Sequence, residues 1–236
     1  MAFSDELEQI LDLVFPTDCL ACGKGGGRVL CETCIARVAS SCSSAQPDAS
    51  ACRFERLPGI NGFRAAGPYQ GILKELVLHM KSSGKPFAFP LARLMVAAAG
   101  NDPDYIAADA IYYVPSEKAR VKERGHNPAE VLAVEVSTLL GRPLSHGLEK
   151  TRATRDQDRL PAALRWGNVS GAFRCVPGSR PRGSVLLVDD VLTTGATAGA
   201  CAGALLDAGA EAVYVLVAAR AVFHAGISVD EQKICI

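Results

Sequence analysis

The stretch from Ser184 to Arg220 constrains the fold more than any other part of this 236-residue chain. An apolar run at residues 185–188 is followed by a polar loop, a helix-like segment that stops near Gly209, and a second apolar run at residues 213–217. Apolar runs of this kind, separated by a helix, are typical of parallel strands that are buried on both faces. The sequence therefore predicts an α/β fold with a parallel sheet flanked by helices.

The same alternation extends upstream, and it suggests two domains. Strands are expected at residues 63–69 and 110–114, and helices at residues 72–80, 89–98 and 129–140. The first 58 residues differ, because a short amphipathic helix at residues 7–14 is followed by a segment rich in Cys, Gly and Ser with little periodicity. Such a segment cannot bury a core of its own and needs a metal ion or disulfide bonds for stability. We therefore divide the chain into a helix and cysteine-rich module, residues 1–58, and an α/β domain, residues 59–236.

The spacing of the cysteines indicates which group stabilises this module. The pairs Cys19-x2-Cys22 and Cys31-x2-Cys34 are separated by eight residues, so each pair presents two thiolates to one tetrahedral cation. In a reducing compartment such crowding points to metal before disulfides. A redox-active pair is the alternative, although one pair would suffice for it. We expect a structural zinc site with these four ligands.

Charge and hydropathy exclude two broad classes. The 25 Lys and Arg residues balance 25 Asp and Glu residues, which excludes a uniformly basic nucleic-acid-binding chain and an acidic disordered one. The longest apolar stretches fall far short of the roughly 18 residues that a membrane helix needs. The N-terminus is acidic where a secretory signal would be basic. We expect a cytoplasmic protein without a membrane span.

Two adjacent carboxylates, Asp189 and Asp190, follow the first apolar run, and a short loop then leads into the helix. Open α/β folds bind ligands at this end of a strand. Glycine permits a tight turn, and loop amides, a helix N-terminus and threonine hydroxyls can hold a phosphate. The carboxylates suit sugar hydroxyls or a cation instead. A plain buried strand or the acidic strand of an NTPase is the alternative, but the chain has no G-x-x-x-x-G-K-[ST] motif. The loop residues are Thr193, Thr194, Gly195, Ala196 and Thr197.

This stretch, VLLVDDVLTTGAT, resembles the phosphoribosyl pyrophosphate signature of type I phosphoribosyltransferases. The resemblance implies that Asp189 and Asp190 hold the ribose hydroxyls at the catalytic centre, that residues 193–197 hold the 5′-phosphate, and that Mg²⁺ accompanies the ligand. The motif ERGHN at residues 123–127, the motif TRATRDQ at residues 151–157 and the cysteine-rich start resemble the ComF family. Members of that family join a zinc module to a phosphoribosyltransferase-like domain, and several are linked to DNA uptake in natural competence. The resemblance covers roughly residues 15–220.

Basic residues near the site are assigned by the same resemblance. A departing pyrophosphate requires positive charge, supplied by Mg²⁺ and by Lys or Arg. Residues 150–182 carry eight basic and two acidic side chains, so we expect a mobile basic loop there. Any one of these cations could instead be a solvated surface charge, and a lysine beside an apolar stripe could be snorkelling. The resemblance assigns Arg120, Arg124 and Asn127 to a pyrophosphate loop, Arg152, Thr154 and Gln157 to a flexible closing loop, and Lys81 to the phosphates.

The chain departs from the family pattern at two places. The family usually has Arg-Gly-Phe-Asn-Gln where this chain has RGHNP at residues 124–128, and Pro161 replaces a usual serine. Both changes lie beside expected ligand contacts. Many ComF-like modules carry further cysteine pairs, so Cys42 and Cys52 are either remnants of a second site or substitutes for one of the four ligands.

Two functions from different classes remain open at this point. The first is a Mg²⁺-dependent transferase in which a nitrogen nucleophile displaces pyrophosphate from the ribose anomeric carbon. The second is a non-catalytic DNA-uptake factor that binds single-stranded DNA or a helicase partner, although the basic loop offers only Trp166 and Phe173 for base stacking. A regulator that senses phosphoribosyl pyrophosphate without turnover is a third reading. The acceptor and the oligomeric state, a homodimer included, are not determined by the sequence.

Overall fold

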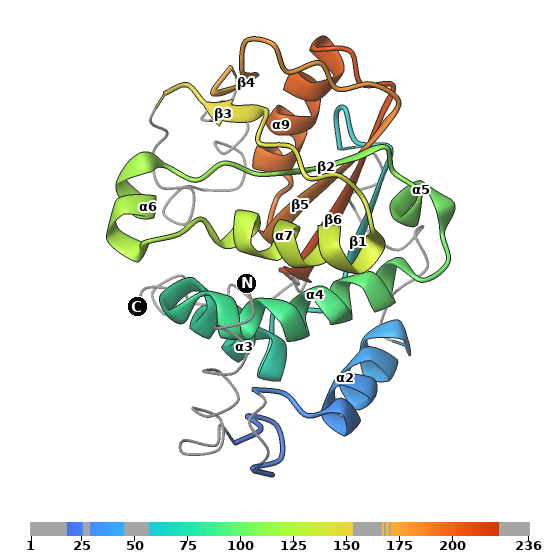
Figure 1. Cartoon of the computed structure of the whole chain (residues 1–236), viewed down its shortest axis with the longest axis vertical. Helices are drawn as coiled ribbons and strands as arrows, with labels where there is room; N and C mark the ends of the chain where they lie inside the picture. Colours follow the sequence, from blue (N-terminus) through green and yellow to red (C-terminus); the bar gives the residue numbers. More distant parts are fainter. Residues whose placement is uncertain are drawn as a thin grey trace, which may run out of the picture.

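A four-stranded parallel sheet forms the centre of the computed structural model, which describes residues 18–25, 29–44, 57–152, 167, 169 and 171–221 (Figure 1). The strand order is β1-β6-β5-β2, and all three neighbouring pairs are parallel. The expected parallel sheet is therefore confirmed. The strands are β1 (Gly62–Ala65), β2 (Ala110–Tyr113), β5 (Ser184–Leu192) and β6 (Ala212–Arg220).

Two strand lengths differ from expectation. Strand β5 runs past the apolar stretch, because Asp189 still faces Val217 in the register with β6. Strand β1 ends at Ala65, earlier than expected, but hydrogen bonds to β6 continue beyond it, and Pro68 forms an isolated bridge with Arg220. The Ala66 amide donates to the Val217 carbonyl at 3.0 Å, the Arg220 amide to the Gly67 carbonyl at 2.9 Å and the Tyr69 amide to the Arg220 carbonyl at 2.7 Å. Proline fits at this bridge because its missing N–H is not used there.

Helices cover both faces of the sheet, as Figure 1 shows. Helices α3 (Gly71–Ser83), α4 (Lys85–Ala99) and α7 (Pro128–Leu140) share one core cluster with the β5 residues Leu186 and Val188. On the other face, α9 (Ala196–Asp207) packs with Val185 and Leu187. Because strand side chains alternate, one run of apolar residues serves both cores. Two short helices, α5 (Pro103–Ile106) and α6 (Lys118–Arg124), lie in the connections.

Gly84 joins α3 to α4 directly. Its φ of +75° suits glycine, and it serves as the C-cap of α3 and the N-cap of α4. Helix α4 begins at Lys85, four residues before the expected start, because Pro86 lies in the first turn, where a helix needs no N–H donor.

A small antiparallel hairpin stands over α9, formed by β3 (Leu148–Lys150) and β4 (Phe173–Cys175). We call it the hood. It corrects the expectation of a basic loop over residues 150–182, because Lys150 ends β3 and Phe173–Cys175 form β4. The hydrogen bond from the Thr151 amide to the Ala172 carbonyl, 2.8 Å, continues the pairing at its base. Thr154, Gln157, Pro161 and Trp166 lie outside the described residues.

The cysteine module packs on α4 through helix α2 (Glu32–Ser44), which the sequence reading missed. Leu30 and Ile35 belong to the same core cluster as α4. Glu32 accepts hydrogen bonds from Arg93 of α4 at 2.6 Å. The boundary at residue 58 stays a prediction, and both the helix expected at residues 7–14 and Cys52 fall outside the described residues.

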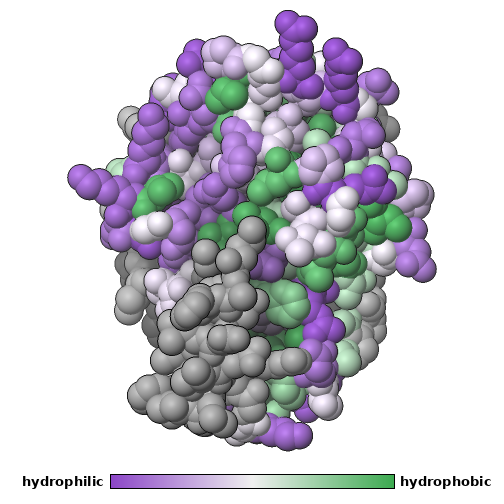
Figure 2. Space-filling model, in the orientation of Figure 1, coloured by the Kyte–Doolittle hydropathy of each residue, from purple (hydrophilic) through white to green (hydrophobic). Residues whose placement is uncertain are grey.

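Surface hydropathy varies over the face shown in Figure 2. Apolar side chains gather near its middle, over α7, where Val134 and Leu139 are exposed. Hydrophilic side chains predominate over the hood above them. Among the described residues, no helix is both long enough and apolar enough to cross a membrane.

Candidate ribose-phosphate site

The adjacent carboxylates at the end of β5 point to opposite faces of the sheet. Asp190 reaches toward α3, where its Oδ2 lies 3.2 Å from Lys81 Nζ. Asp189 lies on the α9 side, where its charge acts on the Cys201 thiol. Each carboxylate also accepts a backbone hydrogen bond, Asp189 Oδ1 from the Asp190 amide at 2.8 Å and Asp190 Oδ1 from the Val191 amide at 2.6 Å. Asp189 Oδ2 is therefore left by these contacts, whereas Asp190 Oδ2 already pairs with Lys81.

Burial and mutual repulsion set the charges of this cluster. Burial raises the pKa of Asp189 well above its usual value, and the neighbouring Asp190 charge raises it further. The carboxylate of Asp190 raises the pKa of Lys81 and holds it as a cation. Lys81 neutralises Asp190, and the raised pKa of Asp189 favours its protonated form, so the two carboxyls carry less negative charge than two isolated aspartates would. Such a cluster suits hydroxyl groups, which donate to a carboxylate without requiring full negative charge.

Lys81 pairs with Asp190 and does not reach outward as a snorkelling side chain. Its side chain is 27% exposed. Its assignment to the phosphates stays a prediction.

A tight turn between β5 and α9 carries the residues that the resemblance assigns to the 5′-phosphate. Thr193, Thr194 and Gly195 lie between the strand and the first residue of α9, and Thr197 lies in the first turn. Thr194 Oγ1 accepts a hydrogen bond from the Ala196 amide at 3.4 Å. The first amides of a helix lack partners within the helix and attract anions. The turn thus places threonine hydroxyls and the first amides of α9 a few residues after the carboxylates of β5.

Gly195 is required by this turn for two reasons. Its φ is +77°, in the left-handed region. A Cβ there would also lie 2.5 Å from Leu57 Cδ2, because the buried Leu57 side chain covers the turn. Leu57 was not singled out from the sequence, since it lies at the edge of the cysteine-rich segment and carries no motif.

Helix α6 and the following turn carry the residues assigned to the pyrophosphate loop. Arg120 and Arg124 are half-buried on α6. Asn127 is 4% exposed and caps α7. Its Oδ1 accepts from Ser116 Oγ at 2.8 Å and from the Ala129 amide at 3.2 Å, while its Nδ2 donates to the Val114 carbonyl at 3.0 Å. Asn127 thus fixes the turn from inside, and its expected contact with pyrophosphate stays a prediction.

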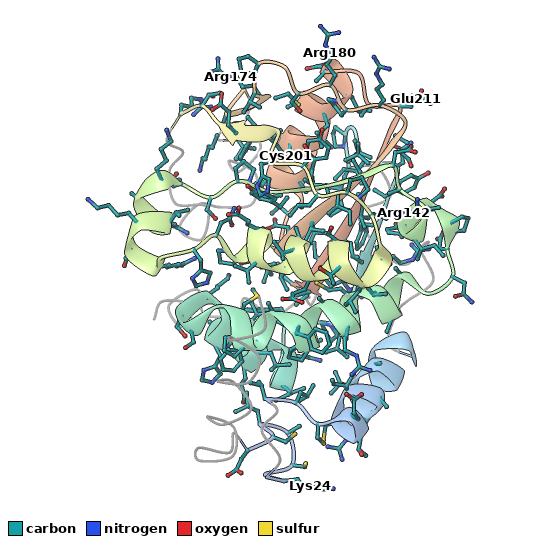
Figure 3. The ribbon with its side chains drawn as sticks, in the orientation of Figure 1. Lys24, Arg142, Arg174, Arg180, Cys201 and Glu211 are labelled. Atoms are coloured by element: carbon teal, nitrogen blue, oxygen red, sulfur yellow. The ribbon has the colours of Figure 1, made fainter. Side chains whose placement is uncertain are left out.

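The hood is joined to the segment before α6 by an ion pair that sequence reasoning missed. Lys150 Nζ lies 2.8 Å from Glu117 Oε1, and the two side chains are 14% and 27% exposed. Arg174 is paired with Glu149 at 2.7 Å. Two of the cations counted in the basic stretch are thereby neutralised. Arg152 lies exposed beyond the hairpin, whereas Arg174 and Arg180 point outward and Cys201 lies inside, beneath the hood (Figure 3).

The four sulfurs of the cysteine module lie within 4.8 Å of one another. Sulfurs around a tetrahedral zinc at about 2.3 Å would be about 3.8 Å apart, and Cys22 Sγ and Cys31 Sγ are 3.8 Å apart. Burial raises the pKa of Cys19, but hydrogen bonds from backbone amides, that of Cys31 first, outweigh it and lower the pKa to about 6. A thiolate at this position is the form that binds metal. Cys19, Cys22, Cys31 and Cys34 can therefore hold a zinc ion.

The chain is similar in sequence to proteins named for DNA utilization or for competence. It is 39% identical over 108 residues to DNA utilization protein YhgH of Escherichia coli K12, which covers 45% of this chain and 47% of that protein. The Salmonella typhi protein of the same name is 36% identical over 135 residues, 54% and 58% of the two chains. Competence protein F of Haemophilus influenzae is 34% identical over 116 residues, 48% and 51%. The chain thus aligns with about half the length of these curated relatives, and they confirm the resemblance to competence proteins. No family model matches it.

Two solved structures are similar to the chain at low identity. One is an allosteric regulatory enzyme of purine biosynthesis, with 21% identity, a TM-score of 0.39 and coverage of 60% of this chain and 30% of that one. The other is orotate phosphoribosyltransferase from Aeropyrum pernix, with 12% identity, a TM-score of 0.33 and coverage of 91% and 93%. Because both TM-scores are below 0.5, the fold assignment rests on the chain's own sheet and cysteine cluster.

Proposed function

We propose that this chain acts in the uptake or utilization of DNA, and that the β5–α9 site binds phosphoribosyl pyrophosphate with Mg²⁺. The names of the relatives support the DNA role. The paired carboxylates directly before the Thr-Thr-Gly turn support the ligand, and this is the observation that carries the second part. The cysteine module would hold one structural zinc ion.

The ligand fits the chemistry of the cluster in two parts. Asp189 and Asp190 would accept hydrogen bonds from the ribose hydroxyls, and the amides and hydroxyls of residues 193–197 would hold the 5′-phosphate. Arg120 and Arg124 would face the pyrophosphate, and Arg152, Thr154 and Gln157 would close over it. Mg²⁺ would neutralise the pyrophosphate charge when bound.

Transfer of the phosphoribosyl group is the second candidate function. It would break the bond between the anomeric carbon and pyrophosphate and form a bond to a nitrogen nucleophile. The three relatives above are named for DNA utilization and competence, and none is named for phosphoribosyl transfer. We therefore place ligand binding first and turnover second.

Calorimetric titration of phosphoribosyl pyrophosphate with Mg²⁺ into the full chain tests the ligand. Saturable binding should be lost in Asp189→Asn/Asp190→Asn and retained in Glu211→Gln, which changes a carboxylate on an exposed turn. Release of pyrophosphate upon addition of amine acceptors would establish turnover. Absence of heat in a folded protein would reject the proposed ligand.

Fluorescence anisotropy with a labelled oligothymidine tests the DNA role. Arg152, which directly follows the hood strand β3 and Thr151, is exposed, and so are Arg180 and Arg182. Arg180 and Lys24 lie at opposite ends of the molecule (Figure 3). If the end that carries Arg180 binds the strand, replacing all three arginines by alanine should weaken binding and reduce the salt slope by about 2, whereas Lys24→Ala should change little. Equal loss in both variants would place the DNA elsewhere, and no binding by the wild-type chain would direct the search to a protein partner.

A further inference from the structure

His126 lies where three segments of the proposed site meet. It follows Arg124 and Gly125 at the end of α6, and its ring packs over the α3–α4 junction, where a Cβ on Gly84 would lie 3.4 Å from the ring. Its side chain is half-buried. The residue therefore touches both the helix that carries Lys81 and the segment that carries Arg124.

Both ring nitrogens of His126 face backbone carbonyl oxygens. Nε2 lies 2.9 Å from the carbonyl oxygen of Met80, in the last turn of α3, and Nδ1 lies 3.1 Å from that of Arg124, the last residue of α6. A neutral imidazole has one N–H, so one of these contacts would set a nitrogen lone pair against an oxygen lone pair. Only the imidazolium donates to both carbonyls.

The position favours a cation for a second reason. Carbonyls in the last turn of a helix lack partners within the helix and carry the negative end of its dipole. The Met80 carbonyl also accepts from the Gly84 amide at 2.9 Å, so it already serves as the cap of α3. An imidazolium there joins the end of α3 to the end of α6.

The neighbouring charges link this proton to anion binding. The charged side chains described on the elements that meet at His126 are Lys74, Glu75 and Lys81 of α3 with the Lys81 partner Asp190, Arg93 of α4, Lys118, Arg120, Lys122, Glu123 and Arg124 of α6, and Glu130 and Glu135 of α7. Cations outnumber carboxylates in this set, so they oppose a further positive charge on the ring. A bound polyanion would offset that repulsion. By linkage, if the bound anion increases the affinity of the ring for a proton, then protonation of the ring must increase the affinity for the anion by the same factor.

We propose that His126 is a positioning residue whose protonated ring clamps the Arg120–Arg124 segment onto α3, so that the site binds a pyrophosphate group more tightly as the pH falls. The inference rests on the proposed function, because it takes α6 as the pyrophosphate-binding segment. Phenylalanine at this position would fill the space without donating.

Calorimetric titration of inorganic pyrophosphate with Mg²⁺ between pH 5.5 and 8.5 tests the clamp. Pyrophosphate itself titrates in this range, so the informative quantity is the ratio of the wild-type association constant to that of His126→Phe, in which the ligand's own titration cancels. The ratio should rise about five-fold or more from pH 8 to pH 5.5. His126→Gln, which keeps a neutral donor, should show no such rise relative to His126→Phe. His79→Phe, a histidine exposed on α3 and stacked on Phe87, should keep the wild-type profile.

A ratio that does not change with pH would overturn the proposal. Side-chain ¹⁵N NMR of the wild-type chain supplies a second readout that requires no variant to fold. Two N–H-bearing nitrogens on His126 in the pyrophosphate complex support the clamp, whereas a neutral tautomer throughout the pH range rejects it. If the wild-type chain binds no pyrophosphate at any pH, the proposed ligand fails. The same NMR spectra of the free chain at pH 5.5 then decide whether His126 bridges the two carbonyls.

Discussion

The buried side chain of Asp189 lowers the stability of the folded chain at neutral pH. Its pKa is raised well above the usual value by burial and by Asp190, so its ionised form is less favourable in the folded chain than in the unfolded one. Since the unfolded state loses this proton first, at about pH 4, folding becomes less favourable as the pH rises from there through the folded pKa. Natural proteins retain such groups where a ligand needs them.

We therefore expect Asp189→Asn to stabilise the free chain at neutral pH. Each kcal/mol gained corresponds to about 2–4 °C in a chain of this size. The gain should decrease toward pH 4 and vanish below it, where the carboxyl is protonated in both states. Thermal melts at pH 4, 6 and 8 check this.

Asp190→Asn is the matched control for this prediction. It removes the partner of Lys81 and should destabilise the chain at pH 8. A gain for Asp189→Asn that is as large at pH 4 as at pH 8 would contradict the assigned cause.

At the scale of single elements, Gly195 sets the geometry of the turn between β5 and α9. Gly195→Ala should destabilise the chain by about 1–3 kcal/mol, because it places a side chain at φ +77° and forces Leu57 aside. Gly203→Ala, on the same helix with no atom within 4 Å of its Cβ, should be neutral or stabilising by up to about 1 kcal/mol. Urea unfolding of both variants measures the difference. Equal effects of the two substitutions would show that the turn does not constrain this position.

Elements with a strong period could be predicted from the sequence, and those without one could not. The apolar stripe through Leu73, Leu76 and Met80 predicted α3, and the continuous run at residues 185–188 predicted the centre of β5. The hood strands have three residues each, too few to show alternation, and they pair across more than twenty residues of polar sequence. Helix α2 was missed because its stripe is short and lies among cysteines and serines.

The candidate site shows the same division. The motif residues of the β5–α9 turn could be located because they are contiguous in the sequence. The ion pairs Lys81–Asp190 and Lys150–Glu117 and the carbonyl contacts of His126 join segments far apart in the chain. No sequence period records such contacts, since they depend on how α3, α6 and the hood pack around the sheet.

At the scale of the whole molecule, the cysteine module and the α/β domain share a core. Leu30 and Ile35 pack with α4, so loss of the metal should expose apolar surface on both. We expect about one zinc per chain in the wild type and in Cys175→Ser, whose cysteine lies in the hood. Cys22→Ser should lower the zinc content and the melting temperature together. Metal analysis and thermal melts measure both, and a wild-type chain purified without zinc would reject the four-cysteine site.

The hood also has a consequence for where the sequence of this chain can tolerate insertions. Its two strands are closed at the base by the Thr151–Ala172 hydrogen bond and anchored to α6 by Lys150 and Glu117. Lengthening a loop whose ends are already pinned costs little, because the entropy of closure grows only slowly with loop length. The stretch between Arg152 and Gly167 is therefore a place where residues could be inserted without disturbing the sheet, whereas the buried Val169 and Ala172 belong to the core. It is equally the place where a reporter could be inserted to follow ligand binding.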